Sequence, residues 1–60
     1  MNNFVEVLIK EIAKTNKVNA DNYDEVDDLY AYLGYDLELD LIRDVGVEST
    51  SDLMELLKKI

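Results

Sequence analysis

The 60-residue sequence contains no cysteine, no histidine and no proline, and Arg43 is its one arginine. Without cysteine it can form neither a disulfide nor a thiolate metal site. Without histidine it lacks the commonest metal ligand and the side chain that most readily exchanges protons near neutral pH. A short helical chain also rarely encloses a substrate pocket. We therefore expect no catalytic residues, no metal and no cofactor.

The chain is also too short to divide, so we expect one domain covering residues 1–60. A chain of this size buries only about 60% of the surface that its unfolded form exposes. Small domains therefore often need a disulfide, a metal or a partner subunit. Because the chain has no cysteine for a disulfide and no histidine or cysteine to bind a metal, good helix packing or self-association must supply stability. The apolar fraction of 48% is ordinary for a globular domain.

Long apolar runs are missing as well. No stretch approaches the roughly 20 apolar residues of a membrane span, and Met1 is followed by asparagines instead of a basic leader segment. From the sequence we expect a cytoplasmic protein that does not bind a membrane.

Positive charge is scarce, and its distribution is uneven. The net charge is −8, and residues 21–55 hold twelve acids against one base, a balance of −11. The first twenty residues are close to neutral, and the last five add two lysines. A negative field of this kind repels nucleic acid and attracts basic surfaces. We expect a basic protein partner and no direct contact with nucleic acid.

The apolar residues that are present recur at helical spacing in four segments, 4–15, 23–33, 36–45 and 50–59. Asn16, Gly34 and Gly46 follow the first three segments, where left-handed residues commonly end helices. Asp21 or Asn22 is expected to cap the second segment, and Ser49 or Thr50 the fourth. The sequence thus predicts an all-α fold, a compact single-domain bundle of three to four short helices. The expected core positions are Val5, Leu8, Ile9, Ile12, Ala13, Tyr23, Val26, Leu29, Tyr30, Leu33, Leu53, Leu56, Leu57 and Ile60.

The third segment supports two interpretations. Residues 35–41, YDLELDL, alternate as a strand does. Leu37, Leu41, Ile42 and Val45 also fit one face of a helix, and a lone strand would have no partner in the chain. We favour a helix capped by Asp36.

Acidic runs also suggest calcium. Asp36, Glu38 and Asp40 have the spacing of the first three ligands of a calcium-binding loop. The sixth position, which needs glycine, is Leu41, and the twelfth, which needs glutamate, is Val47. The pattern therefore predicts no metal site.

The segment DVGVESTSDLMELL, residues 44–57, resembles the modification site of acyl carrier proteins, where a D-x-G-x-D-S element opens a helix. The resemblance implies that Ser49 carries a phosphopantetheine arm, with Glu48 in place of the usual aspartate. The favoured interpretation is simpler, because a serine before an apolar helix is commonly its N-cap.

The residues 21–40 combine many acids with all four tyrosines and hold no base. Tyr32 and Tyr35 fall off the apolar face, and tyrosine is enriched at protein interfaces. Packing over neighbouring helices is the alternative for both. We predict an acidic-aromatic docking surface made of Asp24, Asp27, Asp28, Tyr32, Tyr35, Asp36, Glu38 and Asp40.

These observations favour a small acidic binding module, a regulator or inhibitor that docks on a basic surface of a partner protein. Such a surface could also mimic nucleic acid. The alternatives are a homodimer, whose shared core supplies stability, and a carrier-protein-like fragment.

Overall fold

The computed structural model describes residues 3–60, and for Asn3 its backbone alone. Three helices follow one another: α1 (Asn3–Thr15), α2 (Tyr23–Asp44) and α3 (Thr50–Lys59). No strand occurs in this part of the chain. The prediction of a small all-α bundle is confirmed, and the ambiguous segment after Tyr35 is helical.

The end of α1 is closed by two backbone hydrogen bonds. The Val18 N–H donates to the Ala13 carbonyl at 2.9 Å, and the Lys17 N–H donates to the Lys14 carbonyl at 3.2 Å. This pair of hydrogen bonds forms when a residue just past the helix end has a left-handed backbone conformation. Lys17 has that conformation, with φ 57°. The prediction that Asn16 would be left-handed is wrong by one residue.

Helix α2 covers both predicted helical segments, which join at a kink three residues beyond Gly34. Asn22 caps it, accepting a hydrogen bond from the Glu25 N–H at 3.2 Å. Gly34 lies inside the helix, so the prediction that it ends the helix is wrong. The backbone leaves helical geometry only at Leu37, with φ −121° and ψ 16°. Asp36 precedes this break inside the helix, and it is therefore not the predicted cap.

Gly46 ends α2 as predicted, with φ 72°. The chain then turns back, and the Val47 N–H donates to the Leu41 carbonyl at 2.8 Å. Ser49 caps α3 by accepting a hydrogen bond from the Asp52 N–H at 3.3 Å. The Asp52 carboxylate in turn accepts one from the Glu48 N–H at 3.1 Å, so the start of α3 is held from both sides.

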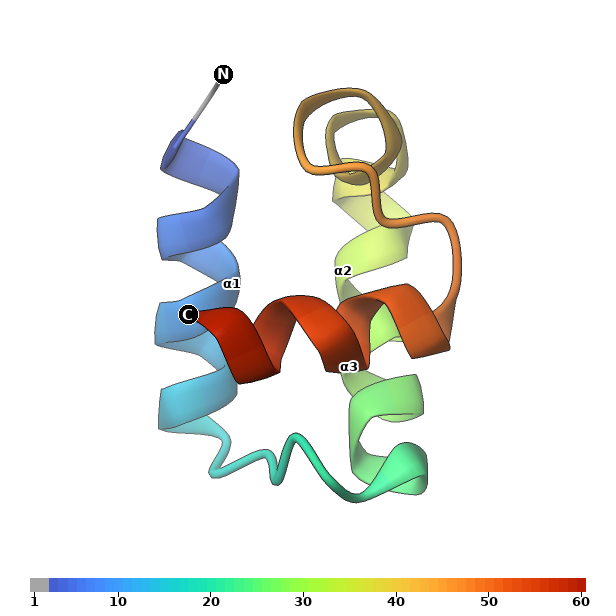
Figure 1. The fold of residues 1–60 in the computed structure, drawn as a ribbon. Coiled ribbons are helices and arrows are strands. Elements are labelled where there is room, and N and C mark those ends of the chain that lie inside the picture. The colour runs from blue at the N-terminus through green and yellow to red at the C-terminus, as the bar shows by residue number, and fades with distance from the viewer. Residues whose placement is uncertain (1–2) are drawn as a thin grey trace.

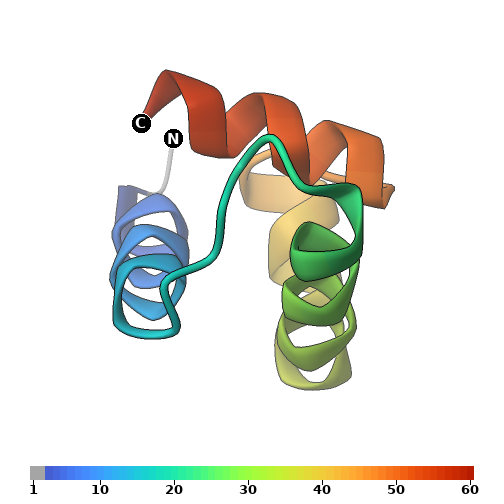
Figure 2. The same ribbon diagram turned by 90° about the horizontal axis from the view of Figure 1, so that it is seen from below.

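The three helices enclose one hydrophobic core. Antiparallel α1 and α2 lie side by side, and α3 crosses both on one side of the pair (Figures 1 and 2). The last turns of α2 run at a large angle to its first part (Figure 1). The buried apolar side chains come from all three helices and from the turn before α3: Val5, Ile9, Ala13, Val26, Leu29, Leu33, Leu41, Val47 and Leu53.

Several predicted core residues are less buried than expected. Tyr23 is 53% exposed, and Ile60 is also exposed. Leu8, Ile12 and Tyr30 are only partly buried. Leu8 and Ile12 line hollows between α1 and α2 to which no residue of α3 contributes, so α3 does not cover them.

Candidate docking surface

All eight residues of the predicted docking surface belong to α2, between Asp24 and Asp40. Some of these side chains bond within the protein, some are exposed without a partner among the described residues, and some line a groove against α1. Asp28 belongs to both of the last two groups.

The Asp27 side chain makes a hydrogen bond to another helix of the protein. Its Oδ1 accepts a hydrogen bond from the Thr50 hydroxyl at 2.7 Å, and Thr50 is only 6% exposed. The bond joins the first part of α2 to the first turn of α3. It satisfies a buried hydroxyl that would otherwise lose its contact with water. Asp27 therefore has a structural role that the helical pattern did not indicate.

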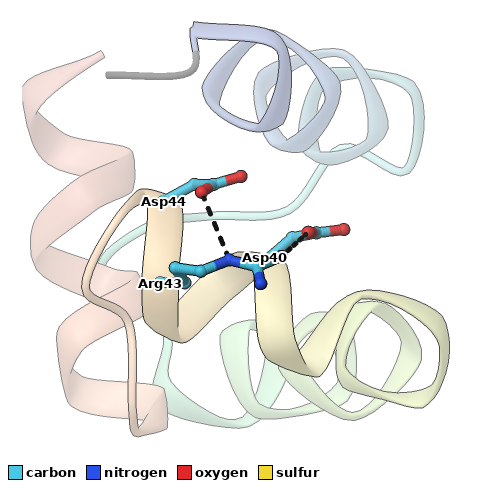
Figure 3. Close-up of polar contacts among 3 residues, drawn as sticks. All are labelled: Asp40, Arg43 and Asp44. Atoms are coloured by element: carbon cyan, nitrogen blue, oxygen red, sulfur yellow. Dashed lines mark hydrogen bonds and ion pairs between the residues drawn. The ribbon is translucent and has the colours of Figure 1, made fainter.

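Asp40 is also engaged. Arg43 lies between two carboxylates, with Nη2 at 3.2 Å from Asp40 Oδ1 and Nε at 3.8 Å from Asp44 Oδ1 (Figure 3). The single arginine of the acidic region thus offsets charge at the end of α2. The Arg43 side chain is largely exposed, and ion pairs of this kind add little stability. Asp40 is accordingly a weaker candidate for partner binding than the acids that precede it.

Asp24, Tyr35 and Glu38 are exposed, and Tyr35 is 89% accessible. Asp24, Asp28 and Tyr35 are four and seven residues apart, so they follow one outer stripe of α2. The carboxylates of Asp24, Asp28 and Glu38 make no hydrogen bond or ion pair with any described residue. This stripe meets water across its full length and is available to a partner.

Asp28, Tyr32 and Asp36 line a groove between α1 and α2. Three adjoining hollows of about 300, 220 and 210 Å³ form it, and Tyr32 borders all three. From α1 and the following loop the groove is lined by Leu8, Glu11, Ile12, Thr15, Asn16 and Val18. From α2 it is lined by Glu25, Asp28, Leu29, Tyr32, Leu33, Asp36 and Leu37. We refer to these residues as the α1–α2 groove.

The groove brings in residues that sequence reasoning missed as site residues. Leu8 and Ile12 were predicted to be core residues, and Glu11 was not among the predicted site residues. One signal was present: the apolar face of residues 4–15 is wide for a helix that packs on a single neighbour. Which part of that face stays open depends on where α3 crosses, and α1 alone does not specify this.

Ser49 serves as the N-cap of α3, so the favoured interpretation of the 44–57 segment is confirmed. The side chain is exposed at the surface. Attachment of a phosphopantetheine arm, which the resemblance to carrier proteins implies, stays a prediction.

Two further properties of the described residues bear on function. Within residues 3–60, no three carboxylates converge in an arrangement that could hold a metal ion. None of the helices in that range combines the length and the apolar character that crossing a membrane requires.

The chain was compared with known proteins on three levels. No protein-family model matches it, and comparisons with curated proteins and with solved structures give no match either. The function must therefore be argued from the surface itself.

Proposed function

We propose that the protein is a small acidic binding module that docks on a basic surface of a partner protein and regulates or inhibits it. One observation carries the proposal: Asp24, Asp28, Asp36 and Glu38 are exposed acids of one helix and have no cationic partner among the described residues. Acids that stabilise a fold usually accept a hydrogen bond or form an ion pair within the protein. Asp27 accepts one from the Thr50 hydroxyl, and Asp52 accepts one from the Glu48 N–H.

The physical consequence is a one-sided electrostatic field. Residues 21–55 carry a balance of −11, and Arg43 offers their only positive charge. A field of this sign accelerates encounters with basic proteins and disfavours nucleic acid and anionic lipid. The proposal includes no catalytic role and places the protein in the cytoplasm. Mimicry of nucleic acid is its special case, in which the carboxylates occupy phosphate positions on a nucleic-acid-binding protein.

The test is a capture experiment with two matched variants. One variant carries Asp24→Asn and Asp28→Asn on the outer stripe of α2. The control carries Glu48→Gln and Glu55→Gln, which remove the same charge from exposed carboxylates elsewhere. Tagged proteins are incubated with nuclease-treated bacterial lysate at about 50 mM and about 500 mM sodium chloride, which changes the screening length severalfold.

We expect one basic protein to be retained by the wild type and the control at low salt, and released at high salt. The stripe variant should bind it roughly tenfold more weakly, equivalent to about 1.4 kcal/mol. Displacement by added duplex DNA would identify the mimicry case. Equal retention by both variants, or retention of the protein's own copies alone, would contradict the proposal.

A homodimer is the second candidate, because Leu8 and Ile12 are left partly uncovered on α1. A second copy seated there would add the apolar burial that a chain of this size lacks. Sedimentation velocity over a wide concentration range tests this directly. A concentration-independent monomer rules the homodimer out.

A further inference from the structure

We propose that the α1–α2 groove binds one amphipathic helix of the partner, with an apolar ridge on the groove floor and lysine or arginine on both flanks. This inference rests on the proposed function and names the partner's chemistry.

The floor is apolar. Leu29 and Leu33 are buried below it, and Leu8, Ile12 and Leu37 remain partly accessible along it. No residue of α3 lines any of the three hollows, and α3 crosses the α1–α2 pair on one side (Figure 2). A surface of this kind is still partly wet, so covering it with apolar groups is favourable.

The length of the groove suits two turns of a helix. Its hollows extend from Asn16 to Leu8 along α1, which corresponds to about 12 Å at 1.5 Å per residue. A helix lying in a groove of this length presents side chains at positions i, i+3 or i+4, and i+7. Three apolar anchors would therefore fill the three adjoining hollows.

The rim determines the charge of the partner. Glu11, Glu25, Asp28 and Asp36 line the three hollows, and no lysine or arginine borders them within the described residues. A helix with basic flanks is complementary to this rim. A second copy of the chain, itself at −8, would bring more negative charge, and nucleic acid would place phosphates against carboxylates.

Tyr32 lies at the centre of the groove. It borders all three hollows and is 66% exposed, whereas Tyr35, one turn further along, borders none of them. A rigid aromatic side chain in the middle of an apolar groove is the usual anchor of an interface. The two tyrosines therefore form a matched pair: one belongs to the groove and the other to the outer stripe.

Two synthetic peptides of about 15 residues serve as probes. The ridge peptide carries leucines at i, i+4 and i+7 in a background of alanine and lysine. The scrambled peptide has the same composition, with the leucines distributed around the helix. Binding to the wild-type protein is measured by fluorescence anisotropy at about 50 mM sodium chloride. Amide shifts in a ¹⁵N-labelled sample locate the bound peptide.

We expect the ridge peptide to bind at least roughly tenfold more tightly than the scrambled one. The amide shifts of Leu8, Ile12, Tyr32 and Leu37 should move most. Tyr32→Ala should weaken ridge-peptide binding roughly tenfold, and Tyr35→Ala by less than about twofold. Far-ultraviolet circular dichroism verifies that both variants keep the helical fold.

Four results would overturn the inference. Equal binding of the two peptides would show that charge alone attracts them, which rejects the groove and leaves the proposed function in place. Absence of binding by either peptide would reject both. A larger loss from Tyr35→Ala would move the contact to the outer stripe. A dimer that Tyr32→Ala dissociates would show that a second copy occupies the groove.

Discussion

The two glycines of the chain have opposite conformational roles. Gly46 has φ 72°, in the left-handed region where a side chain is strained, whereas Gly34 is an ordinary helical residue. A Cβ atom added at either position would meet no atom within 4 Å. The backbone conformation alone therefore separates the effects of substituting them.

Gly46→Ala should lower the free energy of unfolding by about 1 kcal/mol, because alanine is strained at positive φ. Gly34→Ala should raise it by about 0.5–1 kcal/mol, because alanine stabilises a helix interior relative to glycine. Urea unfolding followed by circular dichroism measures both values. Two changes of the same sign would contradict the assignment of these conformations.

Sequence reasoning treated both glycines alike, since each follows an apolar helical segment. Only Gly46 is followed by a chain reversal, with Val47 returning to bond the Leu41 carbonyl. At the end of α1, a lysine occupies the left-handed position. Local residue preferences predict where a helix can end, but the packing of the following segment decides where it does end.

The elements are joined by few polar contacts, and the Asp27–Thr50 hydrogen bond is the main one between α2 and α3. Asp27→Ala should lower the free energy of unfolding by about 1–3 kcal/mol, because it leaves the buried Thr50 hydroxyl without its acceptor. Asp28→Ala is the matched control on the next residue, whose carboxylate has no partner among the described residues. Chemical denaturation of both variants measures the two changes in the free energy of unfolding.

Asp28→Ala should change stability by less than about 0.5 kcal/mol, as surface substitutions usually do. Thr50→Val removes the hydroxyl together with its need for a partner. It should therefore cost less than Asp27→Ala, and adding it to Asp27→Ala should cost little more. Additive losses in the double variant would mean that the two side chains are not coupled.

At the scale of elements, the apolar periodicity predicted the helices and most of the core, since helices of this length are fixed by the face they bury. It placed the break of α2 at Gly34, three residues before the kink at Leu37, because a glycine that follows an apolar segment has the same local pattern inside a helix and after one. It also treated Tyr32 and Tyr35 alike. They differ in their distance from α1, which the periodicity of one helix does not contain.

The whole molecule carries far more negative than positive charge, and its exposed ion pairs, such as Lys58–Asp21, contribute little. Self-repulsion should therefore lower its stability at low ionic strength. We expect the melting temperature to rise as sodium chloride increases from about 20 to about 300 mM, because the shorter screening length weakens repulsion between the acids.

Thermal melts followed by circular dichroism test this prediction. The variant with Asp24→Asn and Asp28→Asn should start from a higher melting temperature at low salt and gain less from added salt, since it has lost part of the repulsion. A melting temperature that falls with salt would indicate that attractive ion pairs outweigh the acid excess.

The sequence predicted the kinds of residue at the candidate site, acids and tyrosines, but not the groove that some of them line. Composition alone indicated an acidic surface with tyrosines, and all eight predicted residues lie on α2. The groove required knowledge of how α1 and α2 pack and of which side α3 leaves open. The carboxylate of Asp27 accepts a hydrogen bond from Thr50 of α3, and that of Asp40 accepts one from the exposed Arg43, one turn along α2.

The kink in α2 at Leu37 limits the longest dimension of the molecule. A straight helix of 22 residues would be about 33 Å long, and the longest dimension of the whole protein is 26 Å. With a straight α2, the chain beyond Leu37 would extend into solvent and carry Leu41 and Val47 out of the core. No proline forces the bend, so burial of these two side chains must hold it. A peptide of the α2 sequence alone would lack the core packing that stabilises the kink at Leu37. The kink is therefore a property of the folded protein and not of the helix by itself.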